Sequence, residues 1–456
     1  MRLWDVIFGH SLESSGRMQK GQFRGETFIS KTDQVKTRLW LTSPHFYPTY
    51  GGAQNRYRKY ISGFLQRGLD VRVITGTPQI DERSESDLME NWYDAKPGSW
   101  LPIASLDGAP LHRIRLPDNK NFSRSRIYYN ALTEMCKEPC DDPLVVQFLT
   151  NMRPNATPWL RQLKNSGAAI IYSVSQYPKW PQKPLKRLYR HRGYRNVYNE
   201  FDALVTNSNT IKDFLYDIGV RTRIEYIPNG VDLARFHPSN SDQERKAALA
   251  VRHQLGIPEH HKIIITVGAI MPRKGSNKVI KAWQRVLTQF PDTHLLFVGP
   301  RSDVHDPKLK QFGLELSSLI ENTGHSEKVH FTGNIENVED HLRASDIFIL
   351  ASDREGTPNS VLEAMATGLP CLVTPYTGIS AGIGKPNEHY QLVDSNPEAI
   401  ASKMLALLQN ANYRSQFGAS GKNFVTAHVD QQHTLDRYAE LYSELGEQAL
   451  HQRKCR

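Results

Sequence analysis

Two glutamates, Glu355 and Glu363, are separated by seven residues in the segment EGTPNSVLE. The apolar run Ile347–Ala351 comes just before them and predicts a buried strand, and the residues from Asn359 onward predict a helix. Where strands and helices alternate, ligands bind beyond the carboxyl ends of the strands. One glutamate therefore lies before the helix, at the expected ligand edge, and the other lies about one turn inside the helix.

The predicted helix start is suited to a phosphate group. The first N–H groups of a helix have no partner within it and carry the positive end of its dipole, so Asn359, Ser360 and Val361 can receive a diphosphate. One turn further on, the carboxylate of Glu363 can reach a pair of ribose hydroxyls, and Glu355 can meet a sugar. In the structural alternative, Asn359 only caps the helix and Glu363 pairs with a nearby lysine.

A second group of candidate residues follows the predicted strand Ile263–Val267. Lys274 stands next to Gly275, and a glycine beside a cation lets the backbone approach a phosphate closely. Arg273 adds a second positive charge, for which a solvated side chain at a turn is the alternative. These two cations are candidates for binding the phosphates.

Paired glycines, Gly51 and Gly52, stand between the predicted strand Arg38–Leu41 and the predicted helix Gln54–Gln66. Backbone without side chains can lie against a ligand, and it also suits an ordinary strand-to-helix turn. Taken alone the glycines favour the turn, and taken with the other motifs they are candidate ligand-binding residues.

These motifs lie in a chain of 456 residues that alternates predicted strands and helices. The alternation is typical of a parallel sheet with helices on both faces. It pauses at the turn-rich segment 227–238 and then begins again, so we predict an α/β fold of two Rossmann-like, doubly wound domains facing a central cleft. The predicted parts are a loosely ordered extension 1–36, a first domain 37–232 with a polar surface connection at 77–110, a second domain 233–430, and a C-terminal helix within 431–456 that returns to the first domain.

The motifs together resemble the E-x7-E signature and the glycine and basic loops of glycosyltransferase family 4, over about residues 37–445. The resemblance implies the GT-B fold and a retaining, hexosyltransferase-type transfer from a nucleotide diphosphate sugar in cell-surface polysaccharide or glycoconjugate synthesis. It implies that Glu355 orients the sugar, that Lys274 stabilises the leaving diphosphate and that Glu363 holds the ribose. The first domain would hold a glycan, lipid-linked or other acceptor.

The sequence departs from the family pattern at two positions. The family usually has an arginine after the first glycine of the basic loop, where this chain has Ala269, and Arg273 is a candidate replacement. Many members have a histidine after the fifth strand of the first domain, where this chain has Ser175. A hydroxyl cannot act as a base near neutral pH as an imidazole does, so no acceptor role of that histidine carries over.

We expect no cofactor and no metal at this site. The sequence contains no Asp-x-Asp, and a nucleotide diphosphate held through a divalent metal usually needs such carboxylates. The helix dipole and Lys274 would carry the phosphate charge instead. The glycine fingerprints of dinucleotide-binding dehydrogenases and of P-loop NTPases are also missing from the sequence.

The net charge of +10 is unevenly distributed, because residues 143–199 hold ten Lys or Arg and no Asp or Glu. Within this stretch, seven cations between Lys179 and Arg195 are mixed with Trp180, Leu185, Leu188, Tyr189 and Tyr194. Such a mixture is typical of attachment to an anionic membrane surface. It is equally typical of a helix whose apolar residues pack inward while its cations stay solvated.

The same basic stretch raises an alternative function, a basic nucleic-acid-binding or non-catalytic GT-B protein. No known nucleic-acid-binding module is recognisable, so we expect no nucleic acid among the partners. No apolar run reaches the length of about 18 residues that spans a bilayer. We therefore predict a cytoplasmic protein, peripheral at the inner face of the membrane in the lipid-binding interpretation.

Overall fold

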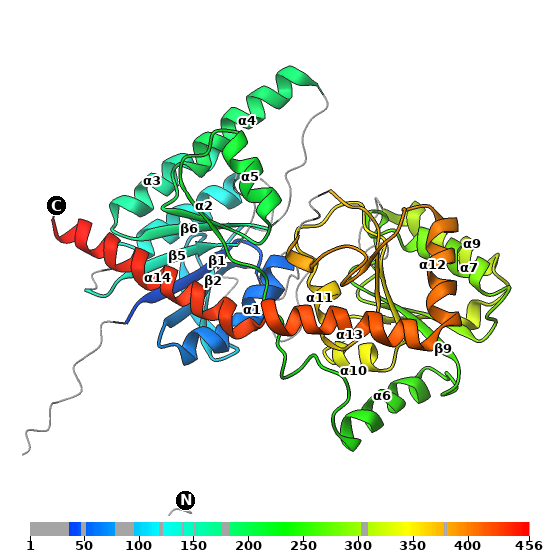
Figure 1. Ribbon diagram of the computed structural model, residues 1–456. Coiled ribbons are helices and arrows are strands. Elements are labelled where there is room, and N and C mark those ends of the chain that lie inside the picture. Colours follow the sequence, from blue (N-terminus) through cyan, green and yellow to red (C-terminus); the bar gives the residue numbers. More distant parts are fainter. Residues whose placement is uncertain are drawn as a thin grey trace, which may run out of the picture. The chain divides into compact units, whose positions relative to one another are not determined.

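The computed structural model contains two sheets of mostly parallel strands with helices packed on their faces (Figure 1). Both sheets belong to one compact unit, Lys36–Arg456. The residues that the structure describes are 36–46, 52–77, 95–117, 122–138, 141–149, 152, 154–175, 183–301, 309–377, 379 and 381–455. Gly51, Trp180 and the predicted extension 1–36, apart from Lys36, lie outside them.

The first sheet has the strand order β3-β4-β2-β1-β5-β6-β7-β8, and its neighbouring strands run parallel except for β3 and β4. Its strands are β1 (Arg38–Ser43), β2 (Asp70–Gly76), β3 (Trp100–Leu106), β4 (Ala109–Ile114), β5 (Leu144–Phe148), β6 (Ala169–Val174), β7 (Ala203–Thr206) and β8 (Arg223–Tyr226). Its helices are α1 (Gly52–Gln66), α2 (Phe122–Met135), α3 (Thr157–Asn165), α4 (Pro184–Tyr198), α5 (Asn209–Asp217) and, from the end of the chain, α14 (Gln431–Lys454).

The central strand β1 shows how the first sheet is covered. Successive side chains of a strand point to opposite faces, and all six residues of β1 are buried. Trp40 packs in the core shared with α2 and α3, whereas Leu39 and Leu41 pack in the core shared with α1 and α14. Tyr438 and Tyr442 of α14 lie in this second core, so the last helix packs on the first sheet.

The second sheet has the order β11-β10-β9-β12-β13-β14, with every pair parallel. Its strands are β9 (Lys262–Val267), β10 (Thr293–Val298), β11 (Val329–Gly333), β12 (Ile347–Leu350), β13 (Cys371–Val373) and β14 (Gln391–Leu392). The helices of this part are α6 (Asp242–Gln254), α7 (Ser276–Val286), α9 (Lys310–Glu321), α10 (Val338–Arg343), α11 (Asn359–Ala366), α12 (Pro397–Gln409) and α13 (Ala411–His428). Apolar side chains of β9 and β12 point alternately into a core with α10, α11 and α13 and into one with α7, α9 and α12.

Most predicted strands and helices are confirmed within a few residues at their ends. The predicted helix Gln54–Gln66 corresponds to α1, which begins two residues earlier, and the predicted strand Ile263–Val267 corresponds to β9, which begins one residue earlier. Helices α6 and α13 were not predicted, and both carry polar residues through much of their length. Their apolar periodicity is therefore weak, and periodicity is the signal on which the prediction depends.

The interpretation of residues 77–110 as a polar surface connection is wrong for its last part. Residues 100–106 form β3, which pairs antiparallel with β4 at the edge of the first sheet. Asp107 and Gly108 have φ angles of 49° and 92° and join the two strands as a two-residue turn. Positive φ at both central residues is the hairpin geometry that Asp-Gly favours, so the missed signal was this dipeptide.

Candidate functional site

The two chemical motifs of the second domain follow strands that are neighbours in its sheet. β9 and β12 pair in parallel, so the segments after them leave the sheet at the same edge. Beyond β9 lies a short 3₁₀ turn, Pro272–Lys274, and beyond β12 lies the loop that leads into α11. This topology places the basic turn beside Glu355.

Glu355 is buried with several donors around one carboxylate oxygen. Its Oε1 atom lies 2.8 Å from Lys274 Nζ and 3.0 Å from an Nη atom of Arg273. Ser352 Oγ donates a hydrogen bond of 2.6 Å to the same oxygen. The structure therefore brings together three of the residues singled out in the sequence, Glu355, Lys274 and Arg273.

The charge of Glu355 follows from these contacts. Burial by itself would raise the pKa of this carboxyl group, but the charge and hydrogen bond of Lys274, the Ser352 hydroxyl and the charge of Arg273 outweigh it and hold the pKa below its ordinary value. Glu355 is therefore ionised at neutral pH. Two cations and one carboxylate leave the cluster with one net positive charge.

Gly275 allows the basic turn to lie this close to β12. Its φ of 70° lies in the left-handed region, which favours glycine. A Cβ atom at this position would lie 2.2 Å from the carbonyl oxygen of Ala351, at the end of β12. Any larger residue would push Lys274 away from Glu355.

The start of α11 carries the predicted phosphate-binding residues. Asn359 and Ser360 are half-buried and Val361 is buried at the first turn. The cap position before the helix is Pro358, and no side chain caps the helix. The Asn359 side chain accepts a 2.5 Å hydrogen bond from Asn229 Nδ2 instead, so the first amides of α11 have no side-chain cap.

Glu363 has a cationic partner from the first domain. Lys59 of α1 donates to Glu363 Oε1 at 2.8 Å, and the carboxylate is largely buried. The structure therefore contains the ion pair of the structural alternative, in which Glu363 pairs with a lysine. The lysine comes from a position 304 residues away, which no spacing in the sequence could indicate.

Sequence reasoning missed Asn229, which links the two domains at this site. Its Oδ1 atom accepts from an Nη atom of Arg56 at 2.6 Å and from Asn207 Nδ2 at 3.1 Å. Its Nδ2 atom donates to the Thr357 carbonyl oxygen at 3.0 Å, in addition to Asn359. In the sequence, the segment Pro228–Gly230 indicated only a turn. In the structure, its asparagine forms hydrogen bonds with residues of both domains.

The two departures from the family pattern lie close to these residues. Ser175 Oγ accepts a 2.8 Å hydrogen bond from the buried Arg56, and a Cβ atom at Gly356 would lie 2.1 Å from the Ser175 carbonyl oxygen. The segment that holds Ser175 is thus in backbone contact with the loop that holds Glu355. At the other departure, Ala269, the preceding residue Gly268 lies against the ammonium group of Lys274.

The paired glycines are only partly described. Gly52 is the first residue of α1, the helix that supplies both Arg56 and Lys59. Gly51 lies outside the described residues. The helix that was predicted to follow this pair is therefore present as α1. Its residues Arg56 and Lys59 contact Asn229 and Glu363.

Helix α4, from the acid-free stretch, has an exposed apolar stripe. Leu185, Leu188 and Tyr189 have relative exposures of 83%, 67% and 82%, and only Val197 and Tyr198 of the helix are buried. The structure therefore contradicts the interpretation in which the apolar residues pack inward for these three, whereas Tyr194 packs against the core of the first sheet. Spacings of three and four residues put the three exposed side chains on one side of the helix.

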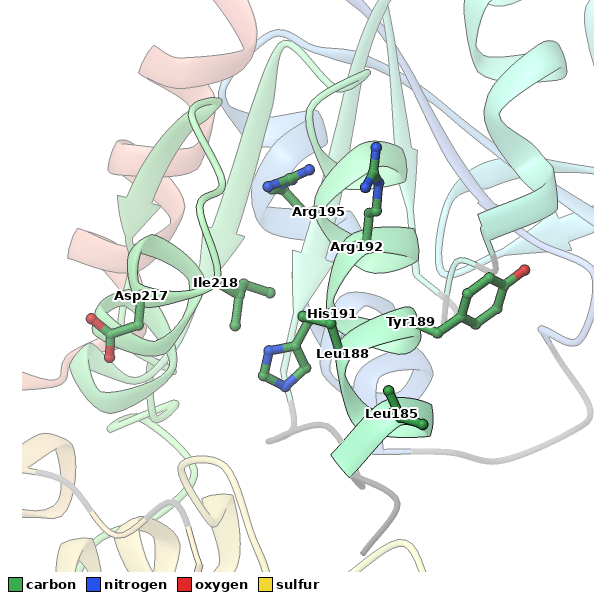
Figure 2. A pocket seen from close by; sticks show the side chains of 8 residues that line it. All are labelled: Leu185, Leu188, Tyr189, His191, Arg192, Arg195, Asp217 and Ile218. Carbon is green, nitrogen blue, oxygen red and sulfur yellow. The ribbon is translucent and has the colours of Figure 1, made fainter. Parts of the chain in front are cut away.

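A shallow hollow lies beside this stripe. Figure 2 shows its lining side chains on α4, with Ile218 opposite them, and Asp217 at the end of α5 completes the lining. His191, Arg192 and Arg195 line it together with the apolar stripe. Among the described residues no helix has the length and apolar composition needed to cross a membrane.

Comparison with protein families gives two matches that together span most of the chain. Residues 50–235 match Glycosyltransferase Family 4, and residues 249–424 match Glycosyl transferases group 1. The first match covers α1 and most of the first sheet, and the second covers both motifs around Lys274 and Glu355.

Individual relatives are more distant. The chain is 28% identical over 279 residues to a GDP-mannose-dependent monoacylated alpha-(1-6)-phosphatidylinositol monomannoside mannosyltransferase of Corynebacterium glutamicum, covering 58% of this chain and 67% of that protein. It is 29% identical over 186 residues to an alpha-monoglucosyldiacylglycerol synthase of Streptococcus pneumoniae, covering 40% of each chain. The match thus spans well under two thirds of the second relative.

Among solved structures, Anabaena HepE in complex with UDP and glucose resembles this chain. The two share 15% sequence identity with a TM-score of 0.67, over 90% of this chain and 100% of HepE. At this identity the likeness shows the fold alone, and the predicted GT-B fold of two Rossmann-like domains is confirmed.

Proposed function

From the premise that this chain belongs to glycosyltransferase family 4, as its family matches show, we propose that it moves a sugar from a nucleotide diphosphate sugar to an acceptor hydroxyl with retention of the anomeric configuration. The reaction is of the hexosyltransferase type. Retention and the class of sugar donor come from the family. The relatives named above give no support to the nucleic-acid-binding alternative.

The observation that carries this proposal is the cluster of Glu355, Lys274 and Arg273 at the same strand edge as the start of α11. When the bond between the sugar and the diphosphate breaks, negative charge develops on the diphosphate. The two cations and the amides of α11 are preorganised to stabilise that charge. Glu355, held ionised by the same cations, would orient the sugar.

Glu363 would hold the ribose hydroxyls of the bound nucleotide. In the structure its carboxylate is engaged by Lys59 at 2.8 Å. The side chain of Lys59 is about two-fifths exposed, so this ion pair is weak and can be exchanged for hydrogen bonds to a ligand. Binding of a nucleotide would therefore release Lys59 from Glu363.

We further propose that transfer needs no metal ion and no cofactor. The support is the positive charge of Lys274 and Arg273 at the proposed phosphate position, together with the lack of Asp-x-Asp in the sequence. Activity should survive EDTA nearly unchanged. A complete loss of activity that added metal restores would contradict this part of the proposal.

The decisive experiment is a panel of nucleotide sugars tested by thermal shift. A bound ligand raises the unfolding midpoint in proportion to the logarithm of its concentration, so the true sugar donor should give the largest, concentration-dependent shift. Transfer from that compound is then followed by NMR of the product. A product of inverted anomeric configuration, or no shift with any member of the panel, would count against the proposal.

For the acceptor we propose a glycan or lipid-linked molecule, reached by a cytoplasmic enzyme that binds the inner face of the membrane. The relatives named above include a phosphatidylinositol mannoside mannosyltransferase and a glucosyldiacylglycerol synthase, both named for lipids. On this chain the support is α4, where Leu185, Leu188 and Tyr189 are exposed among lysines and arginines. Exposed apolar groups beside cations suit insertion at an anionic bilayer surface.

A further inference from the structure

A group of side chains that the proposed reaction does not use lies at the other end of the second sheet. His260 and His261 lie in the turn that enters β9, and Asp292 lies just before β10. Each offers one ligand atom, an imidazole nitrogen or a carboxylate oxygen, and these atoms all lie within 4.8 Å of one another. This is the amino-terminal edge of the strands, whereas Lys274 and Glu355 lie beyond the carboxyl ends.

The backbone already holds the two entry turns together. His261 N donates to the Pro258 carbonyl oxygen at 3.1 Å, which closes the first turn. Lys262 N donates to the Asp292 carbonyl oxygen at 2.9 Å, which ties that turn to the start of β10. Because the main chain is fixed by strand pairing, only side-chain rotations are needed to converge on an ion.

The distance between two of the candidate ligand atoms is already close to the distance between two ligands of one metal ion. His261 Nε2 lies 3.6 Å from an Oδ atom of Asp292. Ligands about 2.0–2.2 Å from a tetrahedral Zn²⁺ lie roughly 3.3–3.6 Å from one another. His260 and Asp292 are exposed, so their side chains can rotate and a water molecule can take the remaining position.

A row of imidazoles behind His261 provides an independent observation. His261 Nδ1 lies 2.9 Å from His294 Nε2, and His294 Nδ1 lies 3.0 Å from His330 Nε2. Each contact needs one N–H and one lone pair, so neutral rings donate in a single direction along the row. If each Nδ1–H donates to the next ring, the lone pair of His261 Nε2 is left facing Asp292, as metal-binding histidines are commonly arranged.

The surrounding charges select the kind of ion. Lys328 Nζ donates to the Pro291 carbonyl oxygen and Arg252 donates to the His261 carbonyl oxygen, so two cations stand close by. They disfavour an ion held by charge alone, such as Mg²⁺ or Ca²⁺. Two imidazoles and one carboxylate suit Zn²⁺ and its transition-metal neighbours.

We propose that His260, His261 and Asp292 bind one divalent transition-metal ion, with Zn²⁺ as the expected ion. The ion joins the entry turns of β9 and β10 and stabilises the second domain. It takes no part in sugar transfer, because it lies at the opposite edge of the sheet from Lys274 and Glu355.

The test is calorimetric titration of the metal-stripped full chain with Zn²⁺ alone. We expect one tight site in the wild type, and His260→Ala and Asp292→Asn should each weaken it at least about tenfold, since either removes one of three ligands. His433→Ala, which removes an exposed histidine of α14, is the matched control and should bind Zn²⁺ like the wild type. Zn²⁺ should raise the unfolding midpoint of the wild type and of the control, but not of the two ligand variants.

Transferase activity separates this proposal from the proposed function. The ligand variants should retain wild-type transfer at 25 °C, because the metal site lies outside the reaction site. Wild-type Zn²⁺ affinity in both ligand variants, or an equal loss in His433→Ala, would show adventitious binding to surface histidines and overturn the proposal.

Discussion

Glu355 is a buried carboxylate whose charge depends on its neighbours. Without Lys274 and Arg273, burial would favour the neutral acid. The same two cations serve the proposed leaving group, so at the residue scale the sugar-orienting group and the phosphate-binding groups are one coupled cluster. Removal of the lysine and removal of the carboxylate should therefore affect activity and stability in different ways.

Lys274→Ala should lower kcat and raise the KM for the nucleotide sugar. The lysine stabilises charge that grows as the diphosphate leaves, and loss of one such donor typically costs about 10²–10³-fold in rate. Steady-state kinetics with the identified sugar donor measure both constants. Lys278→Ala is the matched control, since this lysine pairs with Asp353 at the surface at 2.6 Å. Equal kinetics in the two variants would remove Lys274 from the site.

Glu355→Gln should reduce turnover far more than it reduces stability at neutral pH. The lowered native pKa of Glu355 means that its ionised form contributes stability above the unfolded-state pKa, about 4.3, and that this contribution is lost as the pH falls through the native pKa. The glutamine variant lacks the contribution. Urea unfolding should therefore show a constant difference from the wild type near pH 7, shrinking below about pH 4. A difference independent of pH would mean that Glu355 is not held ionised by its neighbours.

At the scale of elements, α4 is a helix that its own domain scarcely buries. Its apolar stripe contacts neither sheet core, whereas the stripes of α1 and α7 fill theirs. A helix with an exposed apolar side and flanking cations is suited to the interface of a bilayer.

Lys186→Glu/Arg187→Glu should weaken sedimentation with vesicles rich in anionic lipid. Each cation near such a surface contributes about 1 kcal/mol, so replacing two of them should lower the partition coefficient at least about tenfold at low salt. High salt should reduce wild-type binding as well. Lys246→Glu/Lys403→Glu, which makes the same charge change at exposed positions in the second half of the chain, is the control. Should the wild type stay in the supernatant at low salt with every lipid composition, a soluble acceptor becomes the proposal.

At the scale of the whole molecule, Asn229 joins groups from three separate segments. It satisfies Arg56 and Asn207 on one side and Thr357 and Asn359 on the other. All four contacts are inside the molecule, where an unpaired polar group is costly. Through Arg56 and Asn359, this residue holds α1 next to the start of α11.

Asn229→Ala should lower the unfolding midpoint and weaken binding of the nucleotide sugar. The buried guanidinium of Arg56 loses one of its partners, which costs about 1–3 kcal/mol, and Asn359 at the helix start loses its restraint. Asn240→Ala, an exposed asparagine at the start of α6, is the control. Calorimetry and nucleotide-sugar titration measure the two effects, and a midpoint equal to that of the control would exclude a linking role.

The sequence by itself determined most of the segments that form strands and helices, and which edge of the second sheet carries the chemistry. Apolar periodicity is a local property, so it predicted α1 and β9 to within two residues of their bounds. Parallel strands end at one edge, so the sequence placed Lys274 after β9 and Glu355 after β12 at the same edge, and the pairing of these two strands brings the residues together. The Asp-Gly dipeptide between β3 and β4 is a local signal of the same kind, because it favours a two-residue hairpin turn.

Only the tertiary structure decided the partners of the individual side chains. Lys59 meets Glu363, and Arg56 meets Asn229, across 304 and 173 residues. The row of His261, His294 and His330 forms because three separate strands begin side by side. Such contacts depend on how sheets and helices pack, and no local spacing encodes them. The same packing leaves the apolar stripe of α4 exposed, because only the end of the helix, at Val197 and Tyr198, lies in the core of the first sheet.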